Sequence, residues 1–438
     1  MIEKILAKIE SREARVGVVG LGYVGLPLLI EFAKAGFNVL GFDLDDSKVQ
    51  KLATGETYIK HIDADIIKTV LSDNEKADAT TDFERISDCD ALLICVPTPL
   101  TNHRDPDLSY VRSTAENLAP HIRPGQLVAL ESTTYPGTTE DVMVPILEKG
   151  SGLSAKTDFF VAYSPEREDP NNIDFNTSTI PKVVGALTPD ALTVARAFYD
   201  TVICETVPVS SCRAAEATKL MENIFRCINI ALVNELKMVF TEMDIDVWEV
   251  VRAASTKPFG FMPFYPGPGL GGHCIPIDPF YLTWKAKEYG ISTRFIELAG
   301  EVNTGMPKYV IHRTMLGLND LGKSLKGSRI LLIGLAYKKN VDDDRESPTY
   351  MLWEELLKHG ATVDYYDPYC PEVRPSREHS CFAGIKSRTL DDIESGGFDV
   401  AIVSTAHDNV DHDSISKLVP LLIDTRGVCS HAENVIQA

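Results

Sequence analysis

The sequence lacks any segment that would carry the chain into or across a membrane. No apolar run reaches the roughly 20 residues that a transmembrane helix needs. Residues 1–17, MIEKILAKIESREARVG, contain no continuous apolar stretch like that of a signal peptide, and they predict a short amphipathic helix leading into a strand. The nine cysteines include no C-x-x-C pair, which argues against both a zinc site and a disulfide framework. We therefore expect a cytoplasmic protein with reduced thiols and no bound metal.

The chain also lacks an excess of positive charge. Its 43 lysines and arginines are outnumbered by 63 acidic residues, which gives a formal net charge of −20. Nucleic acids and anionic membranes attract proteins with a positive surface field, so we expect neither as a partner. Any anionic ligand must then be held by local cationic side chains and backbone N–H groups. The length of 438 residues predicts two or three domains rather than one core.

A glycine motif near the N-terminus predicts a dinucleotide site. Residues 15–19 read as an apolar strand that breaks into GLGYVG; an apolar helical segment, a strand at residues 38–42 and then Asp43 follow. This is the G-x-G-x-x-G fingerprint in its full setting, in which pyrophosphate lies against the helix N-terminus; a tight turn without a ligand is the alternative. Asp43 would bind the ribose hydroxyls and repel a 2′-phosphate, which favours NAD over NADP. The predicted contacts are Gly20, Gly22, Tyr23, Val24, Gly25 and Asp43.

Three further apolar runs, at residues 90–96, 126–130 and 159–162, fit an alternating α/β sheet. They lead into the polar or proline-bearing segments PTP, EST and YSPE. Ligands bind outside the carboxyl ends of strands in open α/β sheets, so these ends should converge on the reactive half of the cofactor. A run at residues 182–185 completes the domain. The candidate residues on the strand ends are Pro97, Thr98, Ser132, Thr133 and Glu166.

The middle of the chain predicts a long helix. Residues 212–255 contain almost no helix breakers, and a second helix can begin after Asp246. Lys219 and Asn223 are four residues apart and therefore project from one face of the first helix. Taken alone, this pair is better explained by an ordinary solvated helix face.

The segment at residues 266–279, PGPGLGGHCIPIDP, surrounds one cysteine with glycines and prolines. Glycines let the backbone approach a ligand closely, so Cys274 is a candidate nucleophile; the alternative is a buried thiol in a surface turn. His273 adjoins Cys274, but neighbouring side chains of an extended segment face apart, so no Cys-His dyad is expected. Asp278, followed by a proline, is predicted to be the N-cap of the next helix.

The last part of the chain predicts a second α/β domain. Apolar strands are expected at residues 329–333, 362–366, 398–403 and 421–423. The turn after the first of these strands, GLAYKKNVDDDRESP, lacks the glycine fingerprint, so we expect no second dinucleotide there. Lys338 and Arg345 in this turn are candidates to reach a phosphate, with solvated surface charges as the alternative.

With these motifs in order, the sequence resembles the UDP-glucose/GDP-mannose dehydrogenase family of nucleotide-sugar 6-dehydrogenases. The motifs that carry the resemblance are GVVGLGYVGLP, VPTP, ESTTYPGT, YSPERE, the helix with Lys219 and Asn223, GGHCIPID and GLAYKKNVDDDRESP. The resemblance implies three parts: an NAD-binding Rossmann domain at residues 1–210, a central helical domain that dimerises at residues 211–315, and a Rossmann-like UDP-sugar-binding domain at residues 316–438.

The resemblance also implies a reaction: oxidation of the sugar C6 alcohol to a carboxylate with two NAD⁺, through a thiohemiacetal and a thioester on Cys274. Lys219 and Asn223 would stabilise the oxyanion, and Asp278, Glu166 and Thr133 would position and deprotonate water. The implied substrate contacts are Glu166, Arg167, Lys219, Asn223, Tyr265, Gly271 and Lys338, with Arg345 on the cofactor side.

One departure from the family pattern bears on the substrate. Many UDP-glucose dehydrogenases place two apolar residues between Ser-Pro-Glu and Arg-Glu, whereas here Glu166 runs directly into Arg167 and Glu168. This resembles the branch acting on UDP-N-acetylhexosamines, and YSPEREDPNN is most similar to the UDP-N-acetylglucosamine enzymes. UDP-N-acetylmannosamine and UDP-glucose are the alternatives, as are a two-electron hydroxyacid dehydrogenase and, in another class, a non-catalytic NAD-sensing scaffold.

Overall fold

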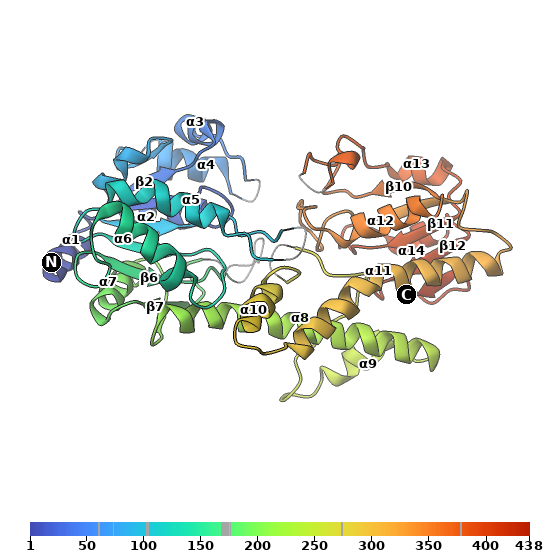
Figure 1. The fold of residues 1–438 in the computed structure, drawn as a ribbon. Coiled ribbons are helices and arrows are strands. Elements are labelled where there is room, and N and C mark those ends of the chain that lie inside the picture. Colours follow the sequence, from blue (N-terminus) through green and yellow to red (C-terminus); the bar gives the residue numbers. More distant parts are fainter. Residues whose placement is uncertain are drawn as a thin grey trace. The chain divides into compact units, whose positions relative to one another are not determined.

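The computed structural model describes residues 1–59, 62–72, 74–101, 105–167, 175, 177–272, 275–376 and 379–438. The chain divides into two compact units. The first comprises Met1–Glu222 and Phe280–Ile291, and the second comprises Asn223–Pro279 and Ser292–Ala438. Figure 1 shows the elements of each unit. No helix in the described ranges has the length and apolarity needed to cross a membrane.

Within its described residues, the first unit contains an eight-stranded sheet in the order β3-β2-β1-β4-β5-β6-β7-β8. Neighbouring strands are parallel except for β6 and β7, which are antiparallel. The order of β3 to β6 is that of a doubly wound dinucleotide-binding sheet. The strand bounds are β1 Arg15–Val19, β2 Asn38–Phe42, β3 Ala77–Thr80, β4 Ala91–Ile94, β5 Leu127–Leu130, β6 Phe160–Tyr163, β7 Lys182–Ala186 and β8 Thr206–Pro208.

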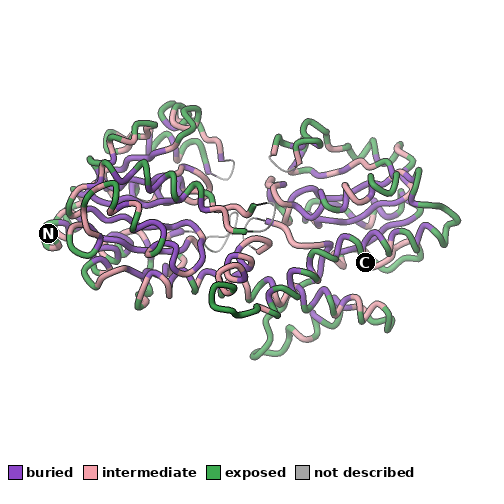
Figure 2. Tube along the Cα trace, in the orientation of Figure 1, coloured by how far each residue is buried: buried purple, intermediate pink, exposed green. Residues whose placement is uncertain are grey.

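Helices cover this sheet because its central strands are apolar on both faces. Side chains such as Val16 and Val18 of β1 form one buried cluster with residues of α1, α2 and α7. Figure 2 shows the strands buried and the outer surfaces of the helices exposed. The helical segments are α1 Ile2–Glu10, α2 Gly25–Lys34, α3 Asp46–Thr54, α4 Ala64–Ile66, η1 Ile67–Ser72, η2 Phe83–Asp88, α5 Ser109–Leu118, η3 Ala119–His121, η4 Thr138–Met143, α6 Val144–Ser151 and α7 Pro189–Tyr199.

The second unit contains a five-stranded parallel sheet, β10-β9-β11-β12-β13, in the part of the chain that is described. Alternate residues of its strands belong to two buried clusters, one with α11 and α12 and the other with α13 and α14, as expected for a sheet covered on both faces. The bounds are α9 Val247–Ala254, α11 Arg294–Asp320, β9 Arg329–Ile333, α12 Pro348–Lys358, β10 Thr362–Tyr366, η5 Ser380–Phe382, α13 Leu390–Ser395, β11 Val400–Val403, α14 His412–Ser416, β12 Leu421–Asp424 and β13 Val435–Gln437.

Two helices contain residues of both units. The long helix α8, Cys212–Glu242, carries Lys219 in the first unit and Asn223 in the second, and α10, Asp278–Lys287, begins in the second unit and continues in the first. The predicted break after α8 is confirmed, because Asp246 caps α9 by accepting a hydrogen bond from the backbone N–H of Trp248 at 2.8 Å.

The predicted fold class is confirmed: an N-terminal Rossmann domain, a helical middle and a second α/β domain. The strands expected at residues 15–19, 38–42, 329–333 and 362–366 have those bounds. Three strands were not predicted: β3, β8 and β13. These strands have only three or four residues, which is too short for a local pattern, so their pairing comes from the neighbouring strand.

Candidate active site

The glycine motif forms a tight turn between β1 and α2. Gly20 adopts φ +94°, and a Cβ added there would lie 2.7 Å from the carbonyl oxygen of Cys95. A Cβ on Gly25 would lie 1.9 Å from the carbonyl oxygen of Gly20, so the first turn of α2 packs directly on the turn. A Cβ on Gly22 would meet no atom within 4 Å. The middle glycine therefore borders open space at the N-terminus of α2, where helix N–H groups favour an anion, and this geometry fits the pyrophosphate of a dinucleotide.

Asp43 lies at the carboxyl end of β2, where it links the turn to α3. Its carboxylate accepts hydrogen bonds from the backbone N–H of Leu21 at 2.9 Å and of Asp45 at 3.0 Å, and from Nζ of Lys48 at 2.9 Å. A carboxylate has about four acceptor positions, so these contacts leave capacity for a ribose hydroxyl. Tyr23 and Val24 are half-buried beside the turn. The residues around the turn thus fit an NAD-type dinucleotide.

The carboxyl ends of β4 and β5 are joined by one side chain. The hydroxyl of Ser132 donates to the carbonyl oxygen of Val96 at 2.6 Å. Pro97 is exposed, whereas Thr98 and Thr133 are half-buried. A further residue of α10, Tyr281, is fully buried and donates from its hydroxyl to the carbonyl oxygens of Thr98 and Pro99 at 2.9 and 3.1 Å. Sequence reasoning missed Tyr281 because nothing in its local pattern separates it from an ordinary helix-core aromatic.

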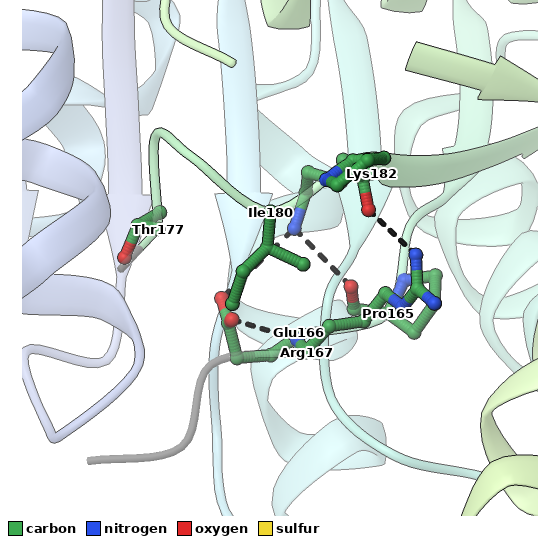
Figure 3. Close-up of a pocket in the computed structure, with 7 residues that line it drawn as sticks. Pro165, Glu166, Arg167, Thr177, Ile180 and Lys182 are labelled. Carbon is green, nitrogen blue, oxygen red and sulfur yellow. Dashed lines mark hydrogen bonds and ion pairs between the residues drawn. The ribbon is translucent and has the colours of Figure 1, made fainter. Parts of the chain in front are cut away.

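A small pocket (Figure 3) is lined by residues that follow β6 and by Lys182, the first residue of β7, which also forms a buried ion pair. Nζ of Lys182 donates to Oε2 of Glu131 at 2.7 Å and to the carbonyl oxygen of Pro165 at 3.3 Å, and it lies 3.9 Å from Oε2 of Glu166. The other carboxylate oxygen of Glu131 accepts from the hydroxyl of Tyr199. Burial alone would lower the pKa of Lys182, but the two carboxylates outweigh it and raise that pKa. The pocket is lined by Pro165, Glu166, Arg167, Thr177, Ile180, Pro181 and Lys182.

Lys219 connects α8 to the segment that carries Glu166. It is only 6% exposed, and its Nζ donates to the backbone carbonyl of Glu166 at 2.6 Å. Arg167, the next residue, forms an ion pair with Glu222 of α8 at 2.7 Å and donates to the carbonyl oxygen of Pro181 at 2.6 Å. The alternative of a solvated helix face is therefore wrong for Lys219. Glu168 lies outside the described residues.

Asn223 and Asp278 form a second buried pair, which belongs to the second unit. They are 1% and 3% exposed, and the side-chain amide of Asn223 donates to the carboxylate of Asp278. Arg226, one turn further along α8, donates to the amide oxygen of Asn223. The prediction that Asp278 precedes its helix as the N-cap is wrong by one residue, because α10 begins at Asp278 itself. Its carboxylate meets a side chain of α8, which the sequence pattern of α10 alone does not reveal.

The glycine-rich loop before Cys274 is packed against the C-terminal domain. A Cβ on Gly271 would lie 2.9 Å from Pro348 and 3.0 Å from Tyr337, and a Cβ on Gly272, which has φ +83°, would lie 3.1 Å from the ring of Tyr337. These positions require glycine because any larger residue would push the loop away. Tyr265 at the start of the loop is 52% exposed. His273 and Cys274 lie outside the described residues.

Two asparagines that sequence reasoning missed hold the start of this loop. The backbone N–H of Gly267 donates to the side-chain oxygen of Asn234 on α8 at 2.9 Å. The amide of Asn234 in turn donates to Asn303 on α11 at 2.9 Å, and Asn303 donates to the carbonyl oxygen of Cys227 at 3.1 Å. Both asparagines are at most 1% exposed. A polar residue on the buried face of α8, three turns after Asn223, is the signal that could have identified Asn234.

The two predicted phosphate contacts lie in the turn after β9. Arg345 forms a two-pronged ion pair with Asp343, with Nε and a terminal nitrogen 2.8 and 2.7 Å from the carboxylate oxygens. Nζ of Lys338 lies 5.7 Å from the ring centre of Tyr337, the residue that packs on Gly272. Lys338 is thus placed near the ring of Tyr337, whereas Arg345 pairs with Asp343 within its own turn.

Comparison with known proteins identifies the domains in chain order. Three domain descriptions of the UDP-glucose/GDP-mannose dehydrogenase family match: the NAD binding domain at residues 14–203, the central domain at residues 213–305 and the UDP binding domain at residues 331–431. The turn around Gly22 lies in the first match, Asn223 in the second and Lys338 in the third.

Relatives extend over nearly the whole chain. A UDP-N-acetyl-D-glucosamine 6-dehydrogenase of Pseudomonas aeruginosa is 36% identical over 412 residues, which cover 93% of this chain and 94% of the relative. A UDP-N-acetyl-D-mannosamine dehydrogenase of Methanococcus maripaludis is 32% identical over 95% of this chain and 94% of its own length. The solved structure of a UDP-D-ManNAc dehydrogenase from Pyrococcus horikoshii has a TM-score of 0.86 at 33% identity, with 95% of this chain and 96% of that chain covered. The chain therefore belongs to the UDP-glucose/GDP-mannose dehydrogenase family and is an NAD-dependent nucleotide-sugar dehydrogenase.

Proposed function

We propose that the chain oxidises the C6 alcohol of a UDP-N-acetylhexosamine to the uronic acid, and that this sugar nucleotide is UDP-N-acetylglucosamine. The observation that carries the proposal is the placement of Lys219 and Asn223, which are both buried on α8. Lys219 donates to the backbone carbonyl of Glu166, and Asn223 donates to the carboxylate of Asp278. Glu166 and Asp278 are the two carboxylates expected to activate water. Identity of 36% to a UDP-N-acetyl-D-glucosamine 6-dehydrogenase, and the direct run of Glu166 into Arg167, favour this sugar over UDP-N-acetylmannosamine.

In the proposed mechanism, the first oxidation converts the C6 alcohol to an aldehyde, and the thiolate of Cys274 adds to the aldehyde carbon to form a thiohemiacetal. The second oxidation gives a thioester, and water then cleaves its C–S bond to release the carboxylate and the thiolate. Bound NAD⁺ supplies the hydride acceptor for both oxidations. Each hydride removed from C6 is accompanied by a proton that leaves the reacting hydroxyl.

Lys219 and Asn223 suit the oxyanion that develops at C6. An ammonium has three N–H donors and a carboxamide has two, so the hydrogen bonds to Glu166 and Asp278 use only part of this capacity. Donors held in place before the reaction stabilise a developing charge without a cost of reorientation. Asp278 and Glu166, with Thr133, position the water and accept its proton.

The same proposal assigns the phosphates to the loops of the second unit. Gly271 and Tyr265 offer backbone and side-chain contacts, and Lys338 beside Tyr337 provides a cation for the diphosphate. Arg167, anchored by Glu222, borders the sugar side, and Arg345 is assigned to the cofactor.

Stoichiometry tests the proposal. Purified protein is supplied with NAD⁺ and a panel of UDP-sugars, and NADH absorbance is compared with the uronic acid formed. We expect two NADH per sugar, fastest with UDP-N-acetylglucosamine, and no acid from Cys274→Ser. One NADH per sugar with an aldehyde or ketone product would instead support a two-electron dehydrogenase. No NADH with any sugar would support the NAD-binding scaffold.

We also propose that the chain forms a homodimer through α8. Apolar side chains at helical spacing on α8 are well exposed: Met221 75%, Phe225 48%, Leu232 52% and Val239 47%. A stripe of this kind on a helix is typical of a surface that another chain covers. Light scattering after gel filtration should give the mass of a dimer, and Leu232→Glu should shift it toward the monomer. An unchanged mass for the variant would place the contact elsewhere.

A further inference from the structure

A cluster of cationic groups in the second unit has no role in the proposed reaction. At its centre is Lys237 of α8, which is 1% exposed and whose Nζ has no hydrogen-bond partner among the described residues. A lysine is almost never buried without a partner, because its ammonium loses the hydrogen bonds of water. Burial, followed by repulsion from Arg426, lowers the pKa of Lys237 to about 7.

Three further donors around Lys237 are also buried without a hydrogen-bond partner in the described residues. Nε1 of Trp248, the hydroxyl of Tyr309 and Nε of Arg313 are buried atoms without a hydrogen-bond partner in the described part of the chain. Nζ of Lys237 lies 5.2 Å from the ring centre of Trp248 and 5.8 Å from that of Tyr309. Tyr309 and Arg313 are one turn apart on α11, so side chains of α8, α9 and α11 meet around Lys237.

The charges in this region do not cancel. Arg426 follows β12; its Nε donates to the carbonyl oxygen of Ser404 at 2.7 Å, and burial lowers its pKa to about 10. Among the described residues, the carboxylate that acts on Lys237 is that of Asp424, and it accepts hydrogen bonds from four backbone N–H groups of residues 426–429 at 2.8–2.9 Å. Those bonds hold the turn after β12 and occupy the lone pairs of Asp424. Three cationic side chains, Lys237, Arg313 and Arg426, therefore share the single carboxylate of Asp424 in this part of the described structure.

We propose that Lys237, Trp248, Tyr309, Arg313 and Arg426 form a binding site for a phosphate-type oxyanion. A tetrahedral oxyanion accepts several charge-assisted hydrogen bonds at once, and it would satisfy donors that otherwise have no acceptor. Lys237 and Trp248 are the buried floor of the site, and Tyr309, Arg313 and Arg426 are partly exposed, which gives the anion a path from solvent. The proposal does not depend on the catalytic reaction.

The site also has a structural consequence for the glycine-rich loop. A Cβ on Gly267 would lie 2.4 Å from a terminal nitrogen of Arg426, so this guanidinium packs directly on the start of the loop. An anion bound to Arg426 would hold the guanidinium in that position. The occupant can be inorganic phosphate or a phosphoryl group of a nucleotide, since both present the same oxygens.

The test is anion binding by the full-length protein without substrate. Melting midpoints are measured with inorganic phosphate, sulfate and chloride at equal ionic strength, and binding heats are measured at about pH 8 in buffers of different ionisation enthalpy. We expect phosphate and sulfate, but not chloride, to raise the midpoint. We also expect uptake of roughly one proton per bound anion, because the largely neutral Lys237 gains a proton when its counter-ion arrives.

Variants locate the site. Lys237→Met should weaken phosphate binding at least about tenfold and abolish the proton uptake. Lys417→Met, which removes an exposed lysine of the same domain, should leave both unchanged. Should Lys237→Met fail to fold, Arg313→Gln at the partly exposed rim should still fold and bind phosphate several-fold more weakly. Competition by UDP but not uridine would identify a nucleotide phosphoryl group as the occupant, and absence of competition would identify a free anion.

Two results would overturn the proposal. Equal melting midpoints in phosphate, sulfate and chloride would mean that water alone satisfies the donors. Phosphate binding by Lys237→Met with the affinity and proton uptake of the unchanged protein would place the anion elsewhere.

Discussion

Replacing Lys182 by methionine should destabilise the N-terminal domain strongly. The change removes the cation that lies 2.7 Å from Glu131, whose side chain is 0% exposed, while Lys182 itself is 5% exposed. Breaking a buried ion pair by removing one partner costs about 3–5 kcal/mol, because the remaining charge has no counter-ion. The double change Glu131→Gln with Lys182→Met should recover most of this loss, since neither member of the pair is then charged. The free energy of unfolding is measured by urea denaturation of the full chain.

The pH dependence gives a second, independent check. Burial already raises the pKa of Glu131 in the unchanged protein, and in Lys182→Met the loss of the cation raises the pKa further. A carboxyl with a raised folded-state pKa costs stability as pH rises, so the deficit should be larger at about pH 8 than at about pH 5. In the unchanged protein the pKa of Lys182 is raised, so its contribution is fully present below the ordinary lysine pKa and is lost only as pH rises through the raised value. A deficit below about 1 kcal/mol, or one independent of pH, would refute the assignment of a buried ion pair.

Three further predictions concern the cofactor turn and the glycine-rich loop. Gly25→Ala should destabilise the protein by ~1–3 kcal/mol in thermal melts, because the added Cβ would overlap the backbone of Gly20. The control Gly22→Ala should keep the stability of the unchanged protein but bind NAD⁺ more weakly in calorimetry. Equal stability of the two variants would contradict this prediction. Asp43→Asn should lower the preference for NAD⁺ over NADP⁺, measured as the ratio of kcat/KM values, about tenfold, since one charge that repels a 2′-phosphate is lost; an unchanged ratio would exclude that role. Asn234→Ala should lower the free energy of unfolding by ~1–3 kcal/mol, because the backbone N–H of Gly267 would be buried without an acceptor. The same variant should also speed alkylation of the loop cysteine, which mass spectrometry can monitor. An unchanged alkylation rate would show that this contact does not hold the loop.

Local sequence patterns predicted the elements whose own residues dictate their structure. The strands at residues 15–19 and 329–333 are short apolar runs next to glycines, and such runs form buried parallel strands wherever the chain places them. The edge strands β8 and β13 could not be predicted in this way, because three residues carry too little pattern and their pairing is set by the neighbouring strand.

The residues of the candidate site also differ in whether local sequence or distant contacts determine their structure. The turn at residues 20–25 is local, so its glycines identified it directly. Lys219 and Asn223 were predicted as a pair, but their burial depends on segments far along the chain: Glu166 is 53 residues from Lys219, and Asp278 is 55 residues from Asn223. No spacing rule links residues at such separations, so the roles expected of them come from the resemblance to a family.

The sequence by itself determined two α/β domains, an NAD fingerprint and the helices between them, because these depend on interactions within a few residues. Only the tertiary structure decided that Lys182 pairs with Glu131, that Asn234 holds the glycine-rich loop and that Lys237 is buried among donors. Each of these side chains lies within an ordinary strand or helix pattern. Its function follows from desolvation and from partners brought close by the fold, which a linear sequence does not contain.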